Sequence, residues 1–571
     1  MSIQRGRNPI NKSYVALVIV IIGFAGLQLS ILHKQMSSDH VSVTDELHHL
    51  LESEEEMKDV IRGAMKEVMT ELITDTLMTT ENEEDSSIGD SEDDDDDDET
   101  TEPLPKADSQ EDNPSKTNDA DLLTKPTVNE LPNDNVRKEP KTNSGMNIVL
   151  LYADDWRFDS IGIVNPIVHT PNLDKLASQG MLFSQNAVTT SICWISRACL
   201  ATGQHYARHK TINIGAPVPF FDHWNETLFG KLKDNGYYTG MVGKWHAAEP
   251  PPDAFNEQNF YYGFHIDASG RHITDMNEEH AIQFLQKTEQ QDDPFALFVN
   301  FYAPHHHDGQ PAQYFPSNAT MSLYKDIVIP FAPTATQEAW EALPSFFNDN
   351  NEGRIRWRAR FDTPVKAQRM IKNYFRLISG VDKTCGKIIE QLEKQNLMDN
   401  TMIIFTTDNG YYHAEHGLAD KFYAHQESIR VPLIIKDPRM DKKKIGTQND
   451  DFTLSIDLAP TMLKAAGVDV PQRMQGVDMS PLYKPKEKSS SWRDQFYYEY
   501  PGIPGNSAHI RVQALVRKDY KYMFWLDEDY EQLYHIPTDR YEQHDLARNF
   551  TYKAQLEEMR KAFKAEQSDA Q

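Results

Sequence analysis

The stretch Met146-Asn-Ile-Val-Leu-Leu-Tyr-Ala-Asp-Asp-Trp156 decides the fold class of this 571-residue chain. Its first part, Met146–Tyr152, is an almost continuous apolar run of strand length, which is typical of a parallel strand buried on both faces. The run leads directly into Asp154 and Asp155. In open α/β sheets, ligands bind at the carboxyl ends of the strands. The stretch therefore predicts a buried strand that ends at a functional site.

The same pattern recurs along the chain, with helical segments between the apolar runs. The other expected strands are Tyr238–Val242, Phe295–Phe301 and Thr401–Thr406. The expected helices are Thr170–Gln179, Asp275–Gln286 and Lys366–Gln395. This alternation predicts an α/β fold with a large, mostly parallel sheet flanked by helices, which we assign to residues 145–490.

The pattern of apolar and polar residues changes after about residue 490. The expected strands there are Asp494–Tyr500, Val512–Trp525 and Glu531–Ile536, followed by an amphipathic helix near Tyr552–Glu566. We expect residues 491–571 to form a smaller C-terminal subdomain, an antiparallel sheet with one helix.

The first 144 residues have three different compositions. Tyr14–Leu32 is an uncharged apolar run long enough to cross a bilayer, and Arg5, Arg7 and Lys12 precede it. The positive-inside bias predicts a cytosolic tail (1–12) and a transmembrane signal anchor (13–33), with a cleaved signal peptide as the alternative. Residues 34–80 predict a helical stem, either a short coiled coil that joins chains into a homo-oligomer or a solvated helix. Residues 81–144, with Asp93–Asp98, predict an acidic, disordered linker.

The net charge of −29 is concentrated outside the predicted α/β body. Residues 41–140 contain 32 acidic side chains against 8 Lys and Arg. The body is therefore only mildly acidic, and a nucleic-acid partner is excluded. The three cysteines, Cys193, Cys199 and Cys385, are too few for a disulfide-built fold.

Four predicted strands bring chemically useful side chains to one edge of the sheet. Asp154 and Asp155 follow the first strand, and Asp408 and Asn409 follow Thr401–Thr406. Together they form an all-oxygen ligand set that suits a hard cation such as calcium or magnesium. One acidic pair alone would more often be a helix cap or turn. Two pairs at equivalent strand ends favour a metal site. The other two strands precede Lys244 and His246, and His305.

A motif between the first two strands identifies a family. Cys193-x-x-Ser196-Arg197, followed by Leu200-Ala-Thr-Gly203, resembles the signature of formylglycine-dependent sulfatases of the alkaline-phosphatase-like superfamily. The resemblance extends from about Asn147 to Asp545. It includes Ala153-Asp-Asp-Trp, His169-Thr-Pro-Asn-Leu-Asp174, Gly243-Lys-Trp-His246, Ala303-Pro-His305, Thr407-Asp-Asn-Gly410, His416-Gly, Leu533-Tyr and His544-Asp-Leu-Ala.

The resemblance implies a role for each matching residue. Asp154, Asp155, Asp408 and Asn409 would hold Ca²⁺ beside Cys193, which a formylglycine-generating enzyme would convert to 3-oxoalanine (formylglycine). As its hydrate, this residue would attack the sulfur of a sulfate ester and then expel sulfate. Arg197 would fix the nucleophile, and Lys244 and Lys421 would bind the sulfate oxygens. His305 would protonate the leaving alcohol and His246 would assist the second step, or the two roles would be exchanged.

The sequence departs from the family pattern at Ile195, where Pro or Ala is usual. A bulky β-branched residue at this position could slow the conversion of Cys193. Two alternatives to a carbohydrate sulfatase therefore stay open: a phosphate or phosphonate ester hydrolase of the same superfamily, and a catalytically silent glycan-binding relative. The long stem and linker favour a sulfated carbohydrate over a small hydrophobic sulfate ester.

Three sequons lie in the body, at Asn225, Asn318 and Asn549. Together with the predicted anchor they are typical of a glycoprotein. We therefore expect a single-pass type II membrane protein with its catalytic domain in the Golgi or secretory lumen or outside the cell.

Overall fold

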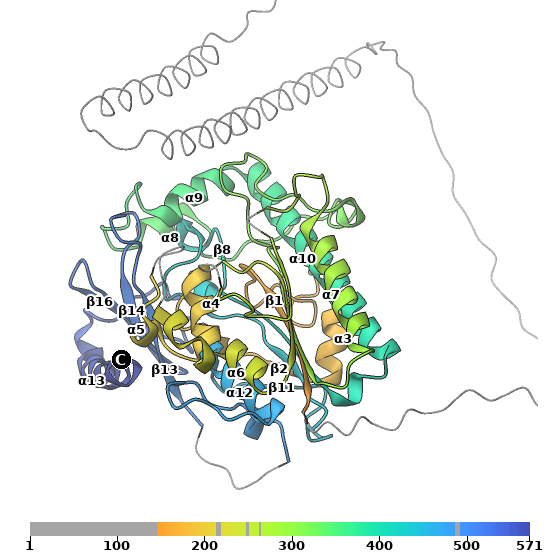
Figure 1. The fold of residues 1–571 in the computed structure, drawn as a ribbon. Coiled ribbons are helices and arrows are strands. Elements are labelled where there is room, and N and C mark those ends of the chain that lie inside the picture. Colours follow the sequence, from red (N-terminus) through yellow and green to blue (C-terminus); the bar gives the residue numbers. More distant parts are fainter. Residues whose placement is uncertain (1–144, 213–218, 247–249, 262–263, 486–491) are drawn as a thin grey trace, which may run out of the picture. The chain divides into compact units, whose positions relative to one another are not determined.

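The computed structural model describes residues 145–212, 219–246, 250–261, 264–485 and 492–571. These residues belong to one compact unit (Figure 1). Within them, no helix is both long and apolar enough to cross a bilayer. The predicted anchor, stem and acidic linker fall outside the described residues.

A large sheet forms the centre of the unit. Its strand order is β11-β2-β10-β7-β1-β6-β4-β5. The bounds are β1 (Asn147–Ala153), β2 (Met181–Phe183), β4 (Tyr238–Gly243), β5 (Glu257–Phe260), β6 (Phe295–Asn300), β7 (Thr401–Thr407), β10 (Ile434–Lys436) and β11 (Thr447–Asn449). β1 pairs in parallel with both β6 and β7, whereas β10 runs antiparallel to β7 and β2. The sheet is thus mixed, because the short strand β10 interrupts an otherwise parallel array.

Helices cover both faces of this sheet, on its two sides in Figure 1. One layer contains α3 (Pro171–Gln179), α7 (Ile273–Thr288) and α10 (Pro364–Lys394). The other contains α4 (Cys193–Thr202), α6 (Leu228–Asp234) and α12 (Leu458–Ala466). In β1, Val149 and Leu151 pack in the core with the first layer, and Ile148 and Leu150 pack with the second. This two-sided burial is why the strand is apolar throughout and does not alternate with polar residues.

The C-terminal segment forms a four-stranded antiparallel sheet in the order β13-β14-β15-β16. The bounds are β13 (Gln495–Tyr500), β14 (Val512–Arg517), β15 (Tyr520–Trp525) and β16 (Tyr530–His535), followed by α13 (Lys553–Ala570). The run predicted as one strand, Val512–Trp525, is instead two strands of a hairpin that turns at Lys518 and Asp519. One face of the sheet packs on α13, and its other face packs on the catalytic body.

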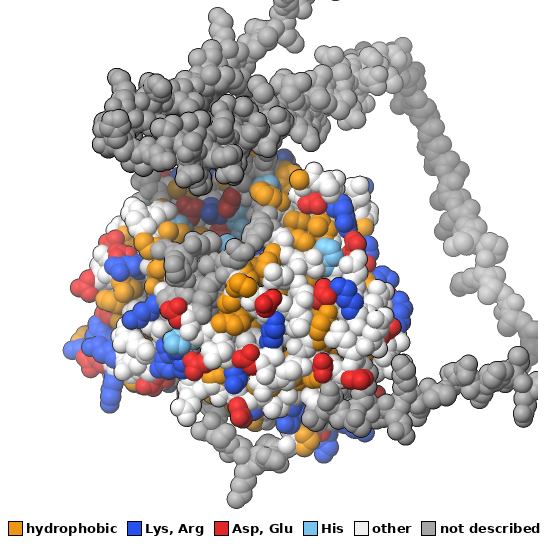
Figure 2. Space-filling model, viewed as in Figure 1, with side chains coloured by type: hydrophobic (Ala, Val, Ile, Leu, Met, Phe, Trp, Pro, Cys, Tyr) orange, Lys and Arg blue, Asp and Glu red, His pale blue; other side chains and the backbone are white. Residues whose placement is uncertain are grey.

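Short elements complete the described chain. They are β3 (Asn186–Ala187), β8 (Tyr412–His413), β9 (Ala419–Asp420), β12 (Thr453–Leu454), α5 (Tyr206–His209), α8 (Gln337–Glu341), α9 (Glu352–Arg360) and α11 (Gln426–Ile429). Over the face shown in Figure 2, acidic and basic side chains are intermixed, which agrees with the mild net charge of the body.

Candidate active site

The two acidic pairs meet because their strands are neighbours in register. Ala153 of β1 lies opposite Thr407 of β7, so the residues that follow both strands emerge side by side. The backbone N–H of Asp155 donates to Asp408 Oδ1 at 3.2 Å, and Asn409 Nδ2 donates to Asp155 Oδ1 at 2.5 Å. Asp155 has a left-handed backbone (φ 61°), which turns the chain sharply at the end of the strand. All four side chains are fully buried.

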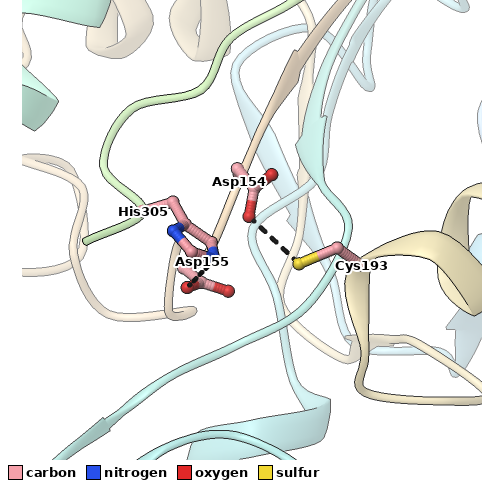
Figure 3. Close-up of side chains that lie close together, drawn as sticks. All are labelled: Asp154, Asp155, Cys193 and His305. Atoms are coloured by element: carbon pink, nitrogen blue, oxygen red, sulfur yellow. Dashed lines mark hydrogen bonds and ion pairs between the residues drawn. The ribbon is translucent and has the colours of Figure 1, made fainter. Parts of the chain in front are cut away.

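Helix α4 brings the cysteine and the arginine to this edge. Cys193 is its first residue and Arg197 lies one turn later, so both project from the same face. Cys193 Sγ lies 3.3 Å from Asp154 Oδ1 and 3.3 Å from Lys421 Nζ. Figure 3 shows the sulfur pointing at Asp154 and the His305 ring pointing at Asp155.

Arg197 holds two of the carboxylates together. Its Nη2 lies 3.0 Å from Asp154 Oδ2 and 2.8 Å from Asp408 Oδ2, and its Nε donates to the same Asp408 oxygen at 3.0 Å. The planar guanidinium can bridge two acceptors in fixed directions, which an ammonium group cannot do. Arg197 thus fixes the relative orientation of the Asp154 and Asp408 carboxylates.

Lys244 and Lys421 approach the cluster from two further loops. Lys244 follows β4 and forms an ion pair with Asp154 Oδ2, and Lys421 follows β9 and forms one with Asp155 Oδ1. Both lysines are buried. Two ammonium groups beside Cys193 would stabilise a tetrahedral anion held there.

His305 lies with its Nε2 3.6 Å from Asp155 Oδ2. Its Nδ1 lies 2.5 Å from the backbone oxygen of His306. Since a carbonyl oxygen can only accept, Nδ1 carries the hydrogen and Nε2 is the nitrogen free to exchange a proton. His246 has a left-handed backbone (φ 54°), and its ring packs edge-on against Trp194. Its buried Nδ1 has no hydrogen-bond partner among the described residues.

The pKa values of neighbouring Asp154 and Asp155 are shifted in opposite directions. Burial raises the pKa of Asp154, but the charges of Lys244, Arg197 and Lys421 outweigh burial and bring it well below the usual value. Burial raises the pKa of Asp155 to about 8, with Asp154, Asp420 and Asp408 adding to the rise and Lys421 opposing it. Burial, followed by the charge of Asp154, also raises the pKa of the Cys193 thiol. An unmodified Cys193 is therefore protonated at neutral pH and a poor nucleophile.

The cluster fits a metal ion. Asp155 Oδ2 and Asn409 Oδ1 are buried without a hydrogen-bond partner among the described residues. Potential ligand atoms of Asp154, Asp155, Cys193 and His305 lie within 4.8 Å of one another. Unpaired buried carboxylate and amide oxygens, with a carboxyl group whose charge is disfavoured, are the environment that a hard cation stabilises.

A cavity of about 450 Å³ opens above these groups. Five of the sequence-predicted catalytic residues line it, namely Cys193, Lys244, His246, His305 and Lys421. Cys193 was also predicted as a metal ligand, whereas Arg197 and the four predicted oxygen ligands are not among the residues that line the cavity. The structure thus brings all ten predicted residues to one place.

Several residues of the site were not predicted. His306 is fully buried, with Nδ1 3.8 Å from Asp155 Oδ2 and Nε2 3.5 Å from Asp420 Oδ2. Arg356 of α9 pairs with Asp420 at 2.6 Å and lines the cavity. His509, from the segment between β13 and β14, also lines the cavity. Of these three residues, only His306 could have been suspected from the sequence, because it lies in the run His305-His306-His307.

The three sequon asparagines, Asn225, Asn318 and Asn549, are exposed. Their positions leave room for a glycan, and their modification stays a prediction.

Comparison with known proteins identifies the class. The sulfatase family matches residues 146–468, more than half of the chain. The chain belongs to the sulfatase family and is a sulfuric ester hydrolase. A second family match, described as N-sulphoglucosamine sulphohydrolase, C-terminal, covers residues 414–569.

Among the curated relatives are sulfatases named for N-acetylglucosamine and for ulvan, together with an arylsulfatase of Clostridium perfringens. An N-acetylglucosamine-6-O-sulfatase of Bacteroides thetaiotaomicron is 26% identical over 484 residues, which are 72% of this chain and 84% of that protein. An ulvan-active sulfatase of Formosa agariphila is 25% identical over 402 residues, which are 66% of this chain and 72% of that protein.

Solved structures share the fold. One, described as a complex with its substrate D-glucosamine-2-N,6-O-disulfate, aligns with a TM-score of 0.63 and 23% identity, covering 75% of this chain and 98% of that one. A phosphonate monoester hydrolase of Agrobacterium radiobacter aligns with a TM-score of 0.61 and 21% identity, covering 75% and 96%. At these identities the likeness establishes the fold alone.

Proposed function

We propose that this sulfatase hydrolyses sulfate esters of carbohydrates with a formylglycine derived from Cys193 and a bound calcium ion. The observation that carries the proposal is the position of Cys193. It lies at the floor of a cavity, between a carboxylate at 3.3 Å and an ammonium group at 3.3 Å. The names of the curated relatives support a sugar as the alcohol part of the ester.

The modified residue and the metal supply the reactive groups. Hydrated formylglycine at residue 193 would supply one hydroxyl for attack on sulfur and a second whose proton loss would expel sulfate, and calcium would favour the ionised form of the first hydroxyl. Asp154, Asp155, Asp408 and Asn409 would hold the ion. The unpartnered oxygens of Asp155 and Asn409 support this assignment.

The remaining side chains bind the sulfate and move protons. Lys244 and Lys421 flank Cys193 and would take up the charge of the transferred sulfate. His305 directs its free Nε2 toward the site and would protonate the leaving sugar hydroxyl. His246 lines the same cavity and would assist the release of sulfate. Ile195 is fully buried in the core beside Cys199 and does not line the cavity, so it leaves substrate access free.

The test has two parts. Mass spectrometry of the peptide containing Cys193 should show an aldehyde after expression with a formylglycine-generating enzyme, and Cys193→Ala should abolish sulfate release from sulfated glucosamine. A thiol at full occupancy together with glycan binding would indicate a silent relative. Faster turnover of phosphate or phosphonate esters than of sulfate esters would indicate the other hydrolase activity.

We also propose that residues 13–33 anchor the chain as a type II membrane protein, with the catalytic domain in the secretory lumen or outside the cell. The exposed sequons support this orientation. Glycosidase treatment of the protein from animal cells should increase its electrophoretic mobility, and a chain without glycans at all three sequons would contradict the orientation.

A further inference from the structure

A second cavity, of about 940 Å³, lies between the catalytic body and the C-terminal sheet. Its wall includes Arg157 from the loop after β1, Arg430 after α11, and Arg517 at the end of β14. It shares no lining residue with the cavity above Cys193.

Arg430 is a half-buried cation of this cavity that makes no close ion pair among the described residues. Arg157 pairs with Asp159 and Glu415, but Arg430 makes no ion pair within 4.0 Å among the described residues. Burial lowers the pKa of Arg430, and the more distant Asp159 and Asp450 offset this only in part. Arg430 is half-buried, so its guanidinium has lost part of its hydration without gaining an ion-pair partner among the described residues.

The guanidinium is held in a fixed orientation. Its Nε donates to the backbone oxygen of Ser184 at 2.6 Å, and its carbon lies 4.3 Å from the centre of the Phe158 ring. Its two terminal nitrogens have no other hydrogen-bond partner within the described part of the chain. They are therefore available for bidentate binding of a sulfate or carboxylate group.

Neutral polar groups lie in the same cavity. Glu427 and His413 are each at least 95% buried, and Glu427 Oε2 and His413 Nε2 have no hydrogen-bond partner among the described residues. Burial, followed by the charges of Glu415 and Glu542, raises the pKa of Glu427 to about 8, so its carboxyl group can donate a hydrogen bond. Among described residues, groups of three metal-ligating atoms occur only at the catalytic site, so these carboxyls do not form a cation site. Glu427 Oε2 and His413 Nε2 are both closed off from solvent, so they lie behind the surface of the cavity wall.

We propose that the second cavity binds an acidic sugar residue, with its sulfate or carboxylate group on Arg430. Partly exposed Phe158 and Phe331 give the cavity apolar faces for the ring. The anion is inferred from Arg430 alone, whereas the choice of a sugar rests on the proposed function. The site would let the enzyme hold an acidic glycan away from the catalytic cavity.

The test is calorimetric titration of the full chain carrying Cys193→Ala with a sulfated disaccharide. Two molecules should bind per chain, one at each cavity. Adding Lys244→Gln should remove the first site only. Adding Arg430→Gln should remove the second site only, with an affinity loss on the order of tenfold or more, as expected for a charged bidentate contact. Arg358→Gln is the matched control and should change neither site, because the Arg358 side chain on α9 is exposed and lies outside both cavities.

A second variant keeps the test decisive if Arg430→Gln fails to fold. Arg540 lines the same cavity and is exposed, so replacing it should not disturb the fold. Arg540→Glu should weaken the second site several-fold while the protein keeps its melting temperature. Binding of only the Lys244-dependent molecule, or no effect of both arginine variants, would overturn the inference. Equal affinity for inorganic sulfate and the sulfated disaccharide would overturn the assignment of a sugar. If the Cys193→Ala chain bound the disaccharide only at the Arg430-dependent site and not in the catalytic cavity, the result would instead count against the proposed function.

Discussion

Arg197 illustrates how single residues organise this site. Its guanidinium contacts Asp154 and Asp408, which follow two different strands, and its Nη1 donates to the backbone oxygen of Lys244 at 3.1 Å. One side chain thus ties together three of the loops that surround Cys193. Removing this bridge would let the carboxylates repel each other in a medium where charges are poorly screened.

Arg197→Lys tests this bridge. We expect kcat for a sulfate ester to fall on the order of a hundredfold, because a lysine keeps the charge but cannot fix both carboxylates, and small displacements in an active site cost about that much. Arg493→Lys is the control, since Arg493 grips both oxygens of Asp457 outside the two cavities. Activity of the Arg197 variant within threefold of the unmodified chain would contradict the role.

At the scale of elements, α3 depends on α10 for its N-terminal cap. Its own cap residue, Thr170, makes no capping hydrogen bond with its side chain. Instead, Asp382 of α10 accepts hydrogen bonds from the backbone N–H groups of Leu173 at 2.8 Å and Asn172 at 3.3 Å. The first N–H groups of a helix have no partner within it, so this carboxyl fastens two helices of one layer together.

Asp382→Ala should lower the free energy of unfolding by about 1–3 kcal/mol at pH 5. Burial raises the pKa of Asp382 to about 6 from its ordinary 3.8. The stabilisation it provides is therefore full below pH 4 and declines as the pH rises through 6, so the variant's deficit should be smaller at pH 7.5. Denaturant unfolding at both pH values measures this. Exposed Asp399→Ala should show neither effect, and a deficit that grows with pH would contradict the argument.

At the scale of the whole molecule, the C-terminal sheet reaches the catalytic loops. The hydroxyl of Tyr498, on β13, donates to the backbone oxygen of Phe422 at 2.7 Å and accepts from the N–H of Ser191 at 3.3 Å. Phe422 follows Lys421, and Ser191 lies two residues before Cys193. Lys521, on β15, forms a buried ion pair with Glu542 at 2.5 Å and donates to the backbone oxygen of Ala424 at 2.8 Å. The sheet thus fixes the spacing between the loop before Cys193 and the loop after Lys421.

Tyr498→Phe should reduce kcat about tenfold with little change in fold, because it removes one hydroxyl that links the two loops and keeps the buried ring. Tyr522→Phe is a matched control on the same sheet, since its hydroxyl bonds to Glu531 beside α13. Steady-state kinetics on a sulfated sugar would measure the difference. Equal losses for both variants would show a general loss of stability and not a positioning role.

Much of the body could be predicted from local sequence. The strands around Met146–Tyr152 and Thr401–Thr406 are confirmed within one residue, because doubly buried strands need continuous apolar runs. The two acidic pairs lie together because neighbouring parallel strands end at one edge. The hairpin turn at Lys518 and Asp519 was missed, because its charged residues do not include the glycine or asparagine that usually marks a two-residue hairpin turn.

What the amino-acid sequence determined by itself was the α/β architecture, the sulfatase family, and the residues carried by its motifs, since these depend on local pattern and spacing. Only the tertiary structure revealed His306 beside Asp155, Arg356 at the cavity, and the link from Tyr498 to the loops of Cys193 and Lys421. It also revealed Arg430, which makes no ion pair among the described residues, in a second cavity. These features join residues as far as 307 positions apart, as from Ser191 to Tyr498. Contacts of that range leave no periodicity in the sequence, because they are set by how whole layers pack.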